Sequence, residues 1–368
     1  MGSRLVNVPA RLRSLDAFRG LTIAGMILVN NPGTWSAIYP PLRHAAWHGL
    51  TPTDLIFPFF LVIVGLAIPP SLGGRSPSQA VVRVARRAAV IFALGLVLSA
   101  VPDFSLATLR IPGVLQRIAV CYLVAAVLFL TTGWRTQAAV TATLLLGYWA
   151  ALTLVPVPGY GPGHLGPEGN LGAWLDRTLL GQAHLWRVSR VYDPEGILST
   201  VPAIATVLIG VLAGSVMKRE REPRATAAGL ALAGAVATMV GAAWALAFPL
   251  NKALWTSSYA VLSAGLALLT FALCYWAVEI RGWRRWASPF VVLGVNALAV
   301  YFLSQLTAQL LVWLRVDAGV SAKRFLFEHA FAPWASPVNA SLAYAATYLL
   351  LWWVAMWGLD RAGIRLRA

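Results

Sequence analysis

Ten long apolar stretches constrain the fold of this 368-residue chain more than any other feature of its sequence. Each approaches the length that an α-helix needs to cross the hydrocarbon core of a bilayer. Hydrophobic residues make up 59% of the chain and charged residues 11%, so the polar surface of a soluble domain is missing. We therefore predict an all-α fold, a polytopic membrane helix bundle that forms a single domain over residues 1–368. The expected membrane helices cover residues 17–33, 53–72, 86–101, 112–131, 137–155, 197–217, 225–248, 258–278, 288–314 and 339–359.

The distribution of basic residues predicts how these helices are oriented. The chain has 29 Lys and Arg against 13 Asp and Glu, a net charge of +16. With the N-terminus in the cytoplasm and sides alternating, most basic residues fall in cytoplasmic segments, as the positive-inside rule expects. Both termini are then cytoplasmic, and segments 34–50 and 156–196 lie outside. The charge does not gather with aromatic side chains on one soluble face, so we expect no nucleic-acid partner.

The first apolar stretch is predicted to be an uncleaved membrane helix and not a secretory signal. Asp16 and Arg19 interrupt its start, and no small-x-small cleavage site follows. Ser14 is the expected N-cap, with Asp16 in the first turn. The residues Asn31-Pro32-Gly33 are expected to end the helix.

A helix-start motif stands at the beginning of the second stretch. Thr51 is the expected N-cap, Pro52 occupies N1, and Asp54 at N3 reaches back to the cap in a capping box. His44 and His48 are therefore expected just outside the first turn of a membrane helix, at the lipid–water boundary. Ionisable side chains are costly at this depth, which makes both histidines candidates for function.

The two histidines do not predict a metal site. They could share one helical face, but the sequence has no Glu in the His-Glu-x-x-His arrangement and no obvious third ligand. We expect no metal. Cys121 and Cys274 both lie inside expected membrane helices, so we expect no disulfide between them.

Further charged residues stand close to expected helix ends on the outer side. Asp193, Pro194 and Glu195 repeat the cap pattern, with Asp193 as N-cap and Glu195 in the first turn. Arg117 lies one or two turns inside the fourth expected helix, where a carboxylate or a ligand pathway must compensate its charge. The outer segment 156–196 contains Gly and Pro throughout and is predicted to be a lid or a binding loop.

Several motifs, in the same order along most of the chain, resemble the heparan-α-glucosaminide N-acetyltransferase family. Members of that family share a multi-helix membrane domain that takes acetyl from cytosolic acetyl-CoA and passes it across the bilayer to an amino sugar. Animal lysosomal members carry an additional first helix and a luminal domain, which we do not expect here, and the implied setting is a bacterial inner membrane. The motifs are residues 14–20, 26–31, 44–59, 110–119, 192–199, 251–258 and 294–297.

The resemblance implies that His44, in the His-x-x-Trp-x-Gly block, is the active-site histidine. Imidazole can accept an acetyl group or remove the proton of an amine near neutral pH. Without the resemblance, a backbone hydrogen bond at the interface would explain His44 equally well. Asn30 would hold the developing oxyanion or fix the tautomer of His44, or else satisfy backbone groups at a helix end. Asp54 would orient a histidine, although its capping role alone already explains it.

The other predicted site residues fall into two groups. Trp255 would stack on a sugar or serve in the aromatic belt, and the carboxylates face the side where an ammonium-bearing sugar arrives. The expected substrate-binding residues are His48, Trp47, Asp193, Glu195, Asn251, Lys252 and Trp255. The residues expected to bind acetyl-CoA are Arg13, Arg19 and Arg117, with Arg83, Arg86 and Arg87 as further cytoplasmic candidates. Positive-inside topology alone would also explain any single cytoplasmic arginine.

Two other functions fit a polytopic membrane protein of this kind. A secondary transporter or sugar permease would account for buried Arg117 and the interrupted helix at 31–33, but no inverted repeat is visible. A membrane O-acyltransferase is closer in chemistry. The expected partners are acetyl-CoA as acetyl donor, an amino sugar or amino-sugar oligosaccharide, and membrane lipid, with a homodimer left open. A transferase also requires a water-lined shaft from the cytoplasmic face, past Arg117, to Asn30 and His44.

Overall fold

The computed structural model describes residues 12–73, 77–220, 222–316 and 319–364. Helices occupy all ten ranges that were expected to form membrane helices. The helices of the bundle are α1 (Arg13–Asn30), α2 (Ile56–Leu72), α3 (Pro77–Ala100), α4 (Val114–Thr131), α5 (Trp134–Leu154), α7 (Thr200–Arg219), α8 (Pro223–Trp244), α9 (Ser257–Tyr275), α10 (Ser288–Val295), α11 (Ala297–Trp313) and α13 (Pro337–Arg361).

Short elements decorate this bundle. Two of them form an antiparallel hairpin, β1 (Arg315–Val316) with β2 (Val320–Ser321). The short helices are η1 (Pro40–Leu42), η2 (Pro52–Leu55), η3 (Leu106–Thr108), α6 (Leu171–Leu179), η4 (Gln182–His184), the π-helix η5 (Trp276–Ile280), α12 (Ala322–Ala330) and η7 (Ala332–Trp334). The predicted all-α class of a polytopic membrane protein is confirmed.

Seven helices of the described ranges are long and apolar enough to cross a membrane. Helices α10 and α11 reach this length and apolarity only together, and they are bent by 79° at Asn296, as in a broken span or a re-entrant loop. The prediction of one continuous helix over 288–314 is wrong, because an apolar composition does not reveal a break in the backbone. Helices α1 and α3 occupy the two remaining expected spans, and both carry several charged residues in their first turns. Their crossing therefore stays a prediction.

The start of α1 differs from the prediction, whereas its end agrees. The helix begins at Arg13 with Leu12 in the N-cap position, so the prediction of Ser14 as N-cap is wrong. Asp16 lies in the first turn as expected, and the helix ends at Asn30.

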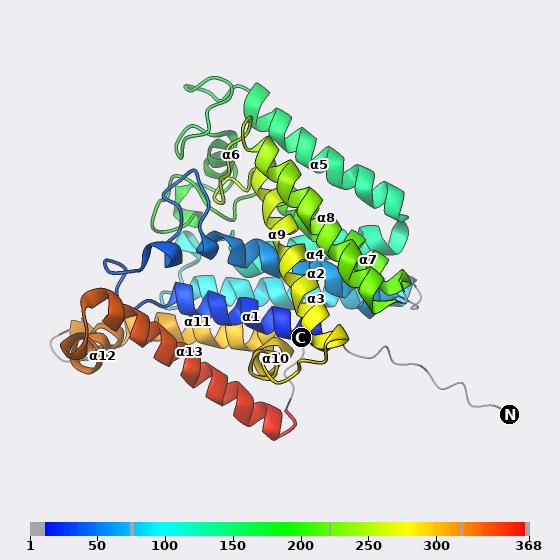
Figure 1. The fold of residues 1–368 in the computed structure, drawn as a ribbon. Coiled ribbons are helices and arrows are strands. Elements are labelled where there is room, and N and C mark those ends of the chain that lie inside the picture. Colours follow the sequence, from blue (N-terminus) through cyan, green and yellow to red (C-terminus); the bar gives the residue numbers. More distant parts are fainter. Residues whose placement is uncertain (1–11, 74–76, 221, 317–318, 365–368) are drawn as a thin grey trace.

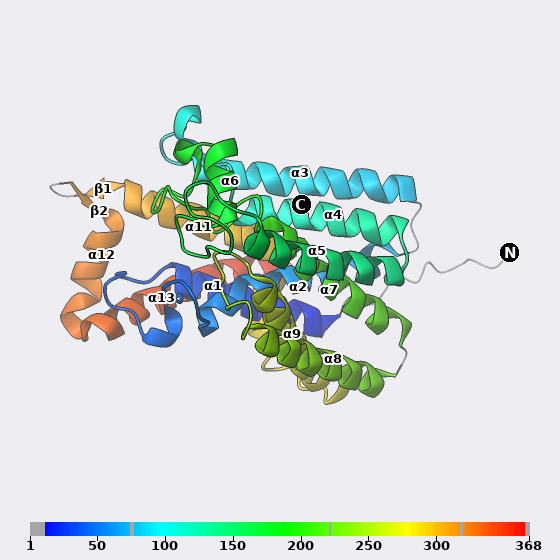
Figure 2. The same ribbon diagram turned by 90° about the horizontal axis from the view of Figure 1, so that it is seen from above.

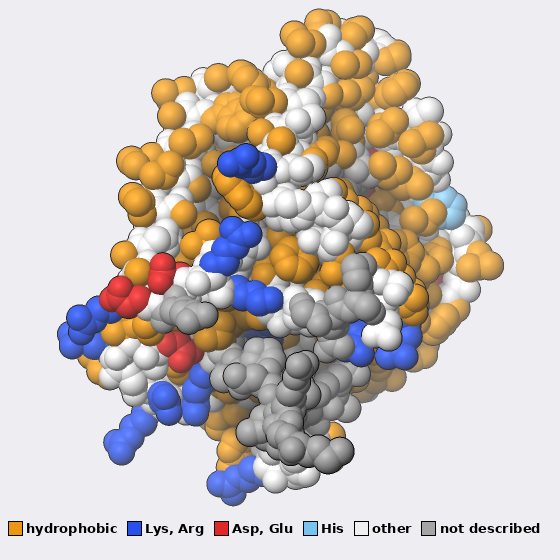
Figure 3. All heavy atoms as spheres, turned by 90° about the vertical axis from the view of Figure 1, so that its right-hand side faces the viewer, with side chains coloured by type: hydrophobic (Ala, Val, Ile, Leu, Met, Phe, Trp, Pro, Cys, Tyr) orange, Lys and Arg blue, Asp and Glu red, His pale blue; other side chains and the backbone are white. Residues whose placement is uncertain are grey.

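The long helices run between two ends of the molecule (Figures 1 and 2). We call one of them the site end; it gathers the loops 31–51, 155–170 and 180–199 and lies toward the left of Figure 1. We call the other the basic end; α2 and α7 end there, and α1, α3 and α8 begin there. Figure 3 looks onto the basic end, where Lys and Arg side chains are scattered among hydrophobic ones.

Glycines let the two helices that carry the site approach their neighbours closely. A Cβ atom on Gly20 of α1 would lie 1.7 Å from the carbonyl oxygen of Phe290 in α10. A Cβ atom on Gly65 of α2 would lie 2.1 Å from the carbonyl oxygen of Val207 in α7. Close backbone contact at small residues is a main source of helix association in membranes. A larger residue at either position would move α1 or α2, and with it the site.

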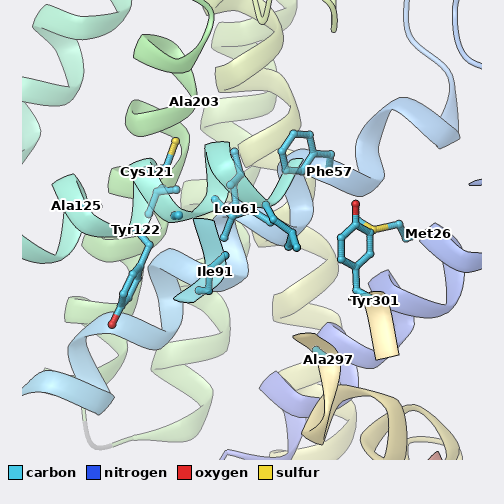
Figure 4. Packing of buried hydrophobic residues seen from close by; sticks show 14 of the residues in the cluster. Met26, Phe57, Leu61, Ile91, Cys121, Tyr122, Ala125, Ala203, Ala297 and Tyr301 are labelled. Carbon is cyan, nitrogen blue, oxygen red and sulfur yellow. The ribbon is translucent and has the colours of Figure 1, made fainter. Parts of the chain in front are cut away.

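The apolar core fills the middle of the bundle. Below the site end, Met26 of α1, Phe57 and Leu61 of α2, and Tyr301 of α11 lie close to one another (Figure 4). All four are buried, and Leu61 is fully enclosed. This layer forms a rigid floor under the candidate site.

Candidate active site

Asp54 combines a capping role with a contact to His44. The predicted capping box is present, and Asp54 Oδ2 accepts hydrogen bonds from the backbone N–H of Thr51 at 3.0 Å and of Ala45 at 3.1 Å. Its other oxygen, Oδ1, lies 2.6 Å from His44 Nδ1. Asp54 is 1% exposed, so all of its contacts are with the protein. The capping role and the orienting role that the sequence left as alternatives therefore coexist.

The Asp54 contact fixes the orientation of the His44 ring. A carboxylate facing Nδ1 favours the tautomer with the proton on Nδ1, which leaves a lone pair on Nε2. The His44 side chain is 45% exposed and lines a cavity of about 350 Å³. His44 therefore presents an oriented, partly exposed imidazole to a ligand in that cavity.

Lys252 places a cationic group beside His44. Its Nζ atom lies 3.2 Å from Nδ1 and 3.3 Å from Nε2 of the imidazole, and 3.9 Å from Asp54 Oδ1. Burial lowers the pKa of Lys252, although the carboxylates of Asp54 and Glu195 act in the opposite direction. A lysine in this setting can change its protonation state during a reaction more easily than a solvated one.

Arg110 holds the two carboxylates that were expected to bind substrate. Its Nε donates to Asp193 Oδ2 at 2.8 Å, and its terminal NH2 group donates to Glu195 Oε2 at 2.6 Å. Burial disfavours the charge of Arg110, but the two carboxylates outweigh it and raise its pKa. Burial likewise raises the pKa of Glu195, and the charges of Arg110 and Arg117 turn the net shift downward. The sequence placed Arg110 in a motif but gave it no role, because its partners lie more than 80 residues away.

The predicted cap role of Asp193 is wrong. Helix α7 begins at Thr200, and its N-cap is Ser199. Asp193 instead accepts the backbone N–H of Glu195 at 3.0 Å, which closes a tight turn. That turn, and not a helix start, is what the Asp-Pro-Glu sequence forms here.

Arg117 and Trp255 form a buried layer beneath these carboxylates. The guanidinium carbon of Arg117 lies 5.1 Å from the centre of the Trp255 ring, and its NH2 group donates to Ser199 and to the carbonyl of Gly196. Trp255 is 1% exposed, so the expectation that it lies on the outer rim and stacks on a sugar is wrong. Arg117 lies at the site end of α4, away from the basic end. The structure therefore does not bring it together with Arg13 and Arg19.

His48, Asn251 and Trp47 support the loops around the cavity. Asn251 is fully buried, and its Nδ2 donates to His48 Nδ1 at 3.3 Å. Burial lowers the pKa of His48, which favours the neutral ring that this contact needs. The indole N–H of Trp47 donates to the carbonyl of Leu165 at 2.9 Å and so joins the loops 31–51 and 155–170. Of these three residues, Trp47 lines the cavity.

The cavity brings together residues from distant parts of the chain. Asn30, His44, Asp54, Glu195 and Lys252 all line it, as the sequence expected for a common site. The loop 180–199, predicted as part of a lid or binding loop, contributes to its wall. Two aromatic lining residues had no signal in the sequence beyond their aromatic character, namely Trp186 and Tyr301, while Tyr192 begins the motif 192–199 but was given no role.

A second large cavity opens toward the basic end. It measures about 470 Å³, and Arg19 and Arg87 are its cationic lining residues. Arg19 also donates to Asp16 Oδ1 at 2.9 Å, and Arg13 donates to Ser288 Oγ at 3.0 Å outside this cavity. The expected shaft past Arg117 is therefore wrong in its course: Arg117 lines neither cavity, and the core layer of Figure 4 lies between the two.

Within the described ranges, no group of three or more His, Cys, Asp and Glu side chains is arranged to hold a metal ion.

Comparison with known proteins places these residues in a family. Residues 11–250 match the family described as "Heparan-alpha-glucosaminide N-acetyltransferase, catalytic". The chain is 32% identical to human heparan-alpha-glucosaminide N-acetyltransferase over 81% of its own length, and 31% identical to the mouse protein over 79%. The matched region covers 53% of each relative, so the chain spans about half the length of the curated relatives it matches. The matched range includes His44, Asp54, Arg110 and Glu195.

Proposed function

The chain belongs to the heparan-alpha-glucosaminide N-acetyltransferase family, and from this premise we propose that it carries acetyl across a membrane. The donor is acetyl-CoA on the cytoplasmic side, and the acceptor is the amine of an amino sugar on the opposite side. The basic end faces the cytoplasm in this proposal, with both termini on that side, in a bacterial inner membrane. The observation that carries the proposal is the His44–Asp54 pair at an accessible cavity within the matched region.

His44 Nε2 is the atom that performs the proton transfer. The acceptor amine forms a bond to the acetyl carbonyl carbon, and the thioester C–S bond breaks. Nε2 takes the proton that the amine loses and passes it to the departing sulfur, so CoA leaves as a thiol. Asp54 keeps Nδ1 protonated and stabilises the imidazolium that forms in between. Asn30 donates to the developing oxyanion in this proposal, which its position in the lining of the same cavity supports.

The cavity at the basic end supports the proposed donor site. Acetyl-CoA carries several phosphates, and Arg19 and Arg87 provide cationic groups on the cavity wall. The acetylated arm of the coenzyme would then have to pass beside the core layer to reach His44. Leu115 lines both this cavity and a larger cavity next to the site, so the two cavities adjoin each other at Leu115.

Vectorial transfer in proteoliposomes tests the proposal. Acetyl-CoA is enclosed inside the vesicles, in which the basic end faces inward. Glucosamine is added outside, on the side that the site end faces. We expect N-acetylglucosamine to appear outside while CoA stays inside. The orientation of the protein in the vesicle is measured by thiol labelling of the Ser36→Cys and Ser78→Cys variants. Both positions are exposed and lie at opposite ends of the bundle, and the native Cys121 and Cys274 are buried.

The same experiment separates an enzyme from a carrier. The bent pair α10–α11 resembles the discontinuous helices of secondary transporters. A carrier would deliver intact glucosamine or acetyl-CoA to the other compartment and form no amide. That outcome would overturn the acetyltransferase proposal.

A further inference from the structure

A vestibule lies beside the candidate active site and leads into it. It measures about 740 Å³ and shares Asn30, Val114, Trp186 and Tyr301 with the smaller cavity that contains His44. One of its walls is α11, from Tyr301 at the level of the site to Trp313 at the end of the helix. The twelve-residue separation between Tyr301 and Trp313 corresponds to a rise of about 18 Å along the helix axis. An acceptor that fills the vestibule is therefore longer than one sugar unit.

The wall formed by α11 is unusually polar for a membrane helix. Gln305 and Gln309 both line the vestibule. Gln305 Nε2 and Gln309 Oε1 are shielded from solvent, and neither has a hydrogen-bond partner among the described residues. Unpaired polar groups at this depth cost free energy, so their presence indicates a ligand that supplies hydrogen bonds. Sugar hydroxyls provide both the donors and the acceptors that two amides need.

The mouth of the vestibule carries positive charge. Arg315 and Lys323 line it, and neither has a carboxylate partner among the described residues. The other two cations that line the vestibule are already paired: Arg187 with Asp103 at 2.8 Å, and Arg110 with Asp193 and Glu195. Lys323 is half-buried, and burial lowers its pKa. An anionic group of the ligand would compensate this charge.

Apolar side chains frame the same mouth. Val312 and Trp313 of α11 line the vestibule and are 50% and 54% exposed. On the opposite wall, Val101 and Pro102 are followed by Phe104, which is 69% exposed. Exposed apolar residues at the end of membrane helices face lipid, so the vestibule is bordered by the outer part of the bilayer. A ligand that enters here can keep a hydrocarbon chain in the membrane.

We propose that the acceptor is a short amino-sugar oligosaccharide attached through a phosphate to a membrane lipid. The phosphate binds Arg315 and Lys323, the sugar part contacts Gln305 and Gln309, and the amine reaches His44. The lipid chain stays beside Val312 and Trp313. This inference rests on the proposed acetyltransferase function and adds the class of acceptor.

Competing acceptors test the inference in vesicles loaded with acetyl-CoA. The three acceptors are free glucosamine, a soluble glucosamine disaccharide phosphate, and the same disaccharide linked through its phosphate to a polyprenol. We expect kcat/KM for the lipid-linked acceptor to exceed both others at least tenfold. Equal values for the lipid-linked and the soluble phosphate would overturn the role of the lipid. Acetylation of free glucosamine without any preference would overturn this inference alone, whereas no acetylation of any acceptor would overturn the proposed function with it.

Two variants with a matched control locate the effect. Lys323→Gln should lower the preference for the lipid-linked acceptor over free glucosamine at least tenfold. Arg324→Gln removes the same charge from the next residue of α12, which is exposed and paired with Glu328, and should leave the preference unchanged. Gln309→Leu should also lower the preference while raising the thermal midpoint, because it removes an unpaired polar group. An unchanged preference in both Lys323→Gln and Gln309→Leu would overturn the assignment of the vestibule.

Discussion

The two ends of the bundle hold their charged side chains in different ways. At the site end, Asp54 pairs with His44, and Arg110 pairs with Asp193 and Glu195. At the basic end, Arg19 pairs with Asp16, whereas the Arg87 guanidinium faces the Tyr122 ring at 5.3 Å and has no carboxylate partner among the described residues. The site end is therefore organised before any ligand arrives, as a catalytic centre requires. The basic end leaves cationic groups for an anionic ligand to complete.

The largest effect is expected at His44. Because Nε2 carries the proton transfer, His44→Ala should lower the turnover number by about a thousandfold or more. Binding of acetyl-CoA should persist, since the coenzyme's affinity comes mostly from its nucleotide and pantetheine parts. Initial rates and a thermal-shift titration with acetyl-CoA measure the two quantities.

His164→Ala is the matched control for this prediction, because His164 is an exposed histidine of an outer loop that does not line the cavity. Near-native turnover in His44→Ala would contradict the assignment. If His48→Ala were the more damaging change, the wrong histidine would have been chosen.

A smaller loss is expected for Asp54→Asn. An amide at this position can still accept from Thr51 or Ala45, but it no longer favours a proton on Nδ1 of His44. By analogy with triads that lose their carboxylate, the turnover number should fall by about a hundredfold to ten-thousandfold. Asp103→Asn provides the control, because Asp103 also pairs with a cation at the site end but is 53% exposed. Equal effects of the two substitutions would show that Asp54 acts only as a helix cap.

At the basic end the effect should be on donor binding. Arg87→Gln removes a cation that we expect to contact a phosphate, so the KM for acetyl-CoA should rise about tenfold, the equivalent of roughly 1.4 kcal/mol. The turnover number should stay within about twofold of the native value, since the reacting groups lie at the other end. Arg135→Gln is the control, because Arg135 stacks on Trp134 outside the cavity. An unchanged KM in Arg87→Gln would mean that this end only provides topological charge.

The contrast between the ends also explains which features could be predicted from the sequence. The capping box at Thr51–Asp54 is a local pattern, and it placed His44 correctly beside η2, the short helix that leads into α2. The bend at Asn296 interrupts an apolar run that looks continuous in sequence. The pairing of Arg110 joins residues more than 80 positions apart, and only the folded bundle brings them together. Local capping chemistry is readable from one sequence, whereas long-range charge pairing and backbone breaks are not.

The Asp-Pro-Glu segment shows how a local pattern can mislead. A helix N-cap and a tight turn both use an Asp side chain that accepts a nearby backbone N–H. Asp193 makes this bond to Glu195, but the chain does not continue as a helix until Thr200. Arg110 favours the tight turn over a helix start, because its guanidinium holds the carboxylates of Asp193 and Glu195 in that turn.

The smallest expected effect concerns stability at the site end, through Asp176 in α6. Asp176 is 2% exposed and accepts the backbone N–H of Ile197 at 2.9 Å, so it braces the turn that leads into α7. Burial raises the pKa of this carboxyl to about 7. Below pH 4 the group is protonated in both the folded and the unfolded chain and affects stability little. Between about pH 4 and pH 7 the unfolded chain loses the proton first, so the free energy of unfolding decreases as the pH rises.

Asp176→Asn keeps an acceptor for Ile197 and cannot ionise. Its thermal midpoint should therefore exceed that of the native protein by a few degrees at pH 8, and the difference should vanish near pH 4. Glu168→Gln, at an exposed position before the same helix, should show no such pH-dependent gain. A constant difference across this pH range would mean that Asp176 stabilises the turn by its shape alone and that its ionisation has no part in it.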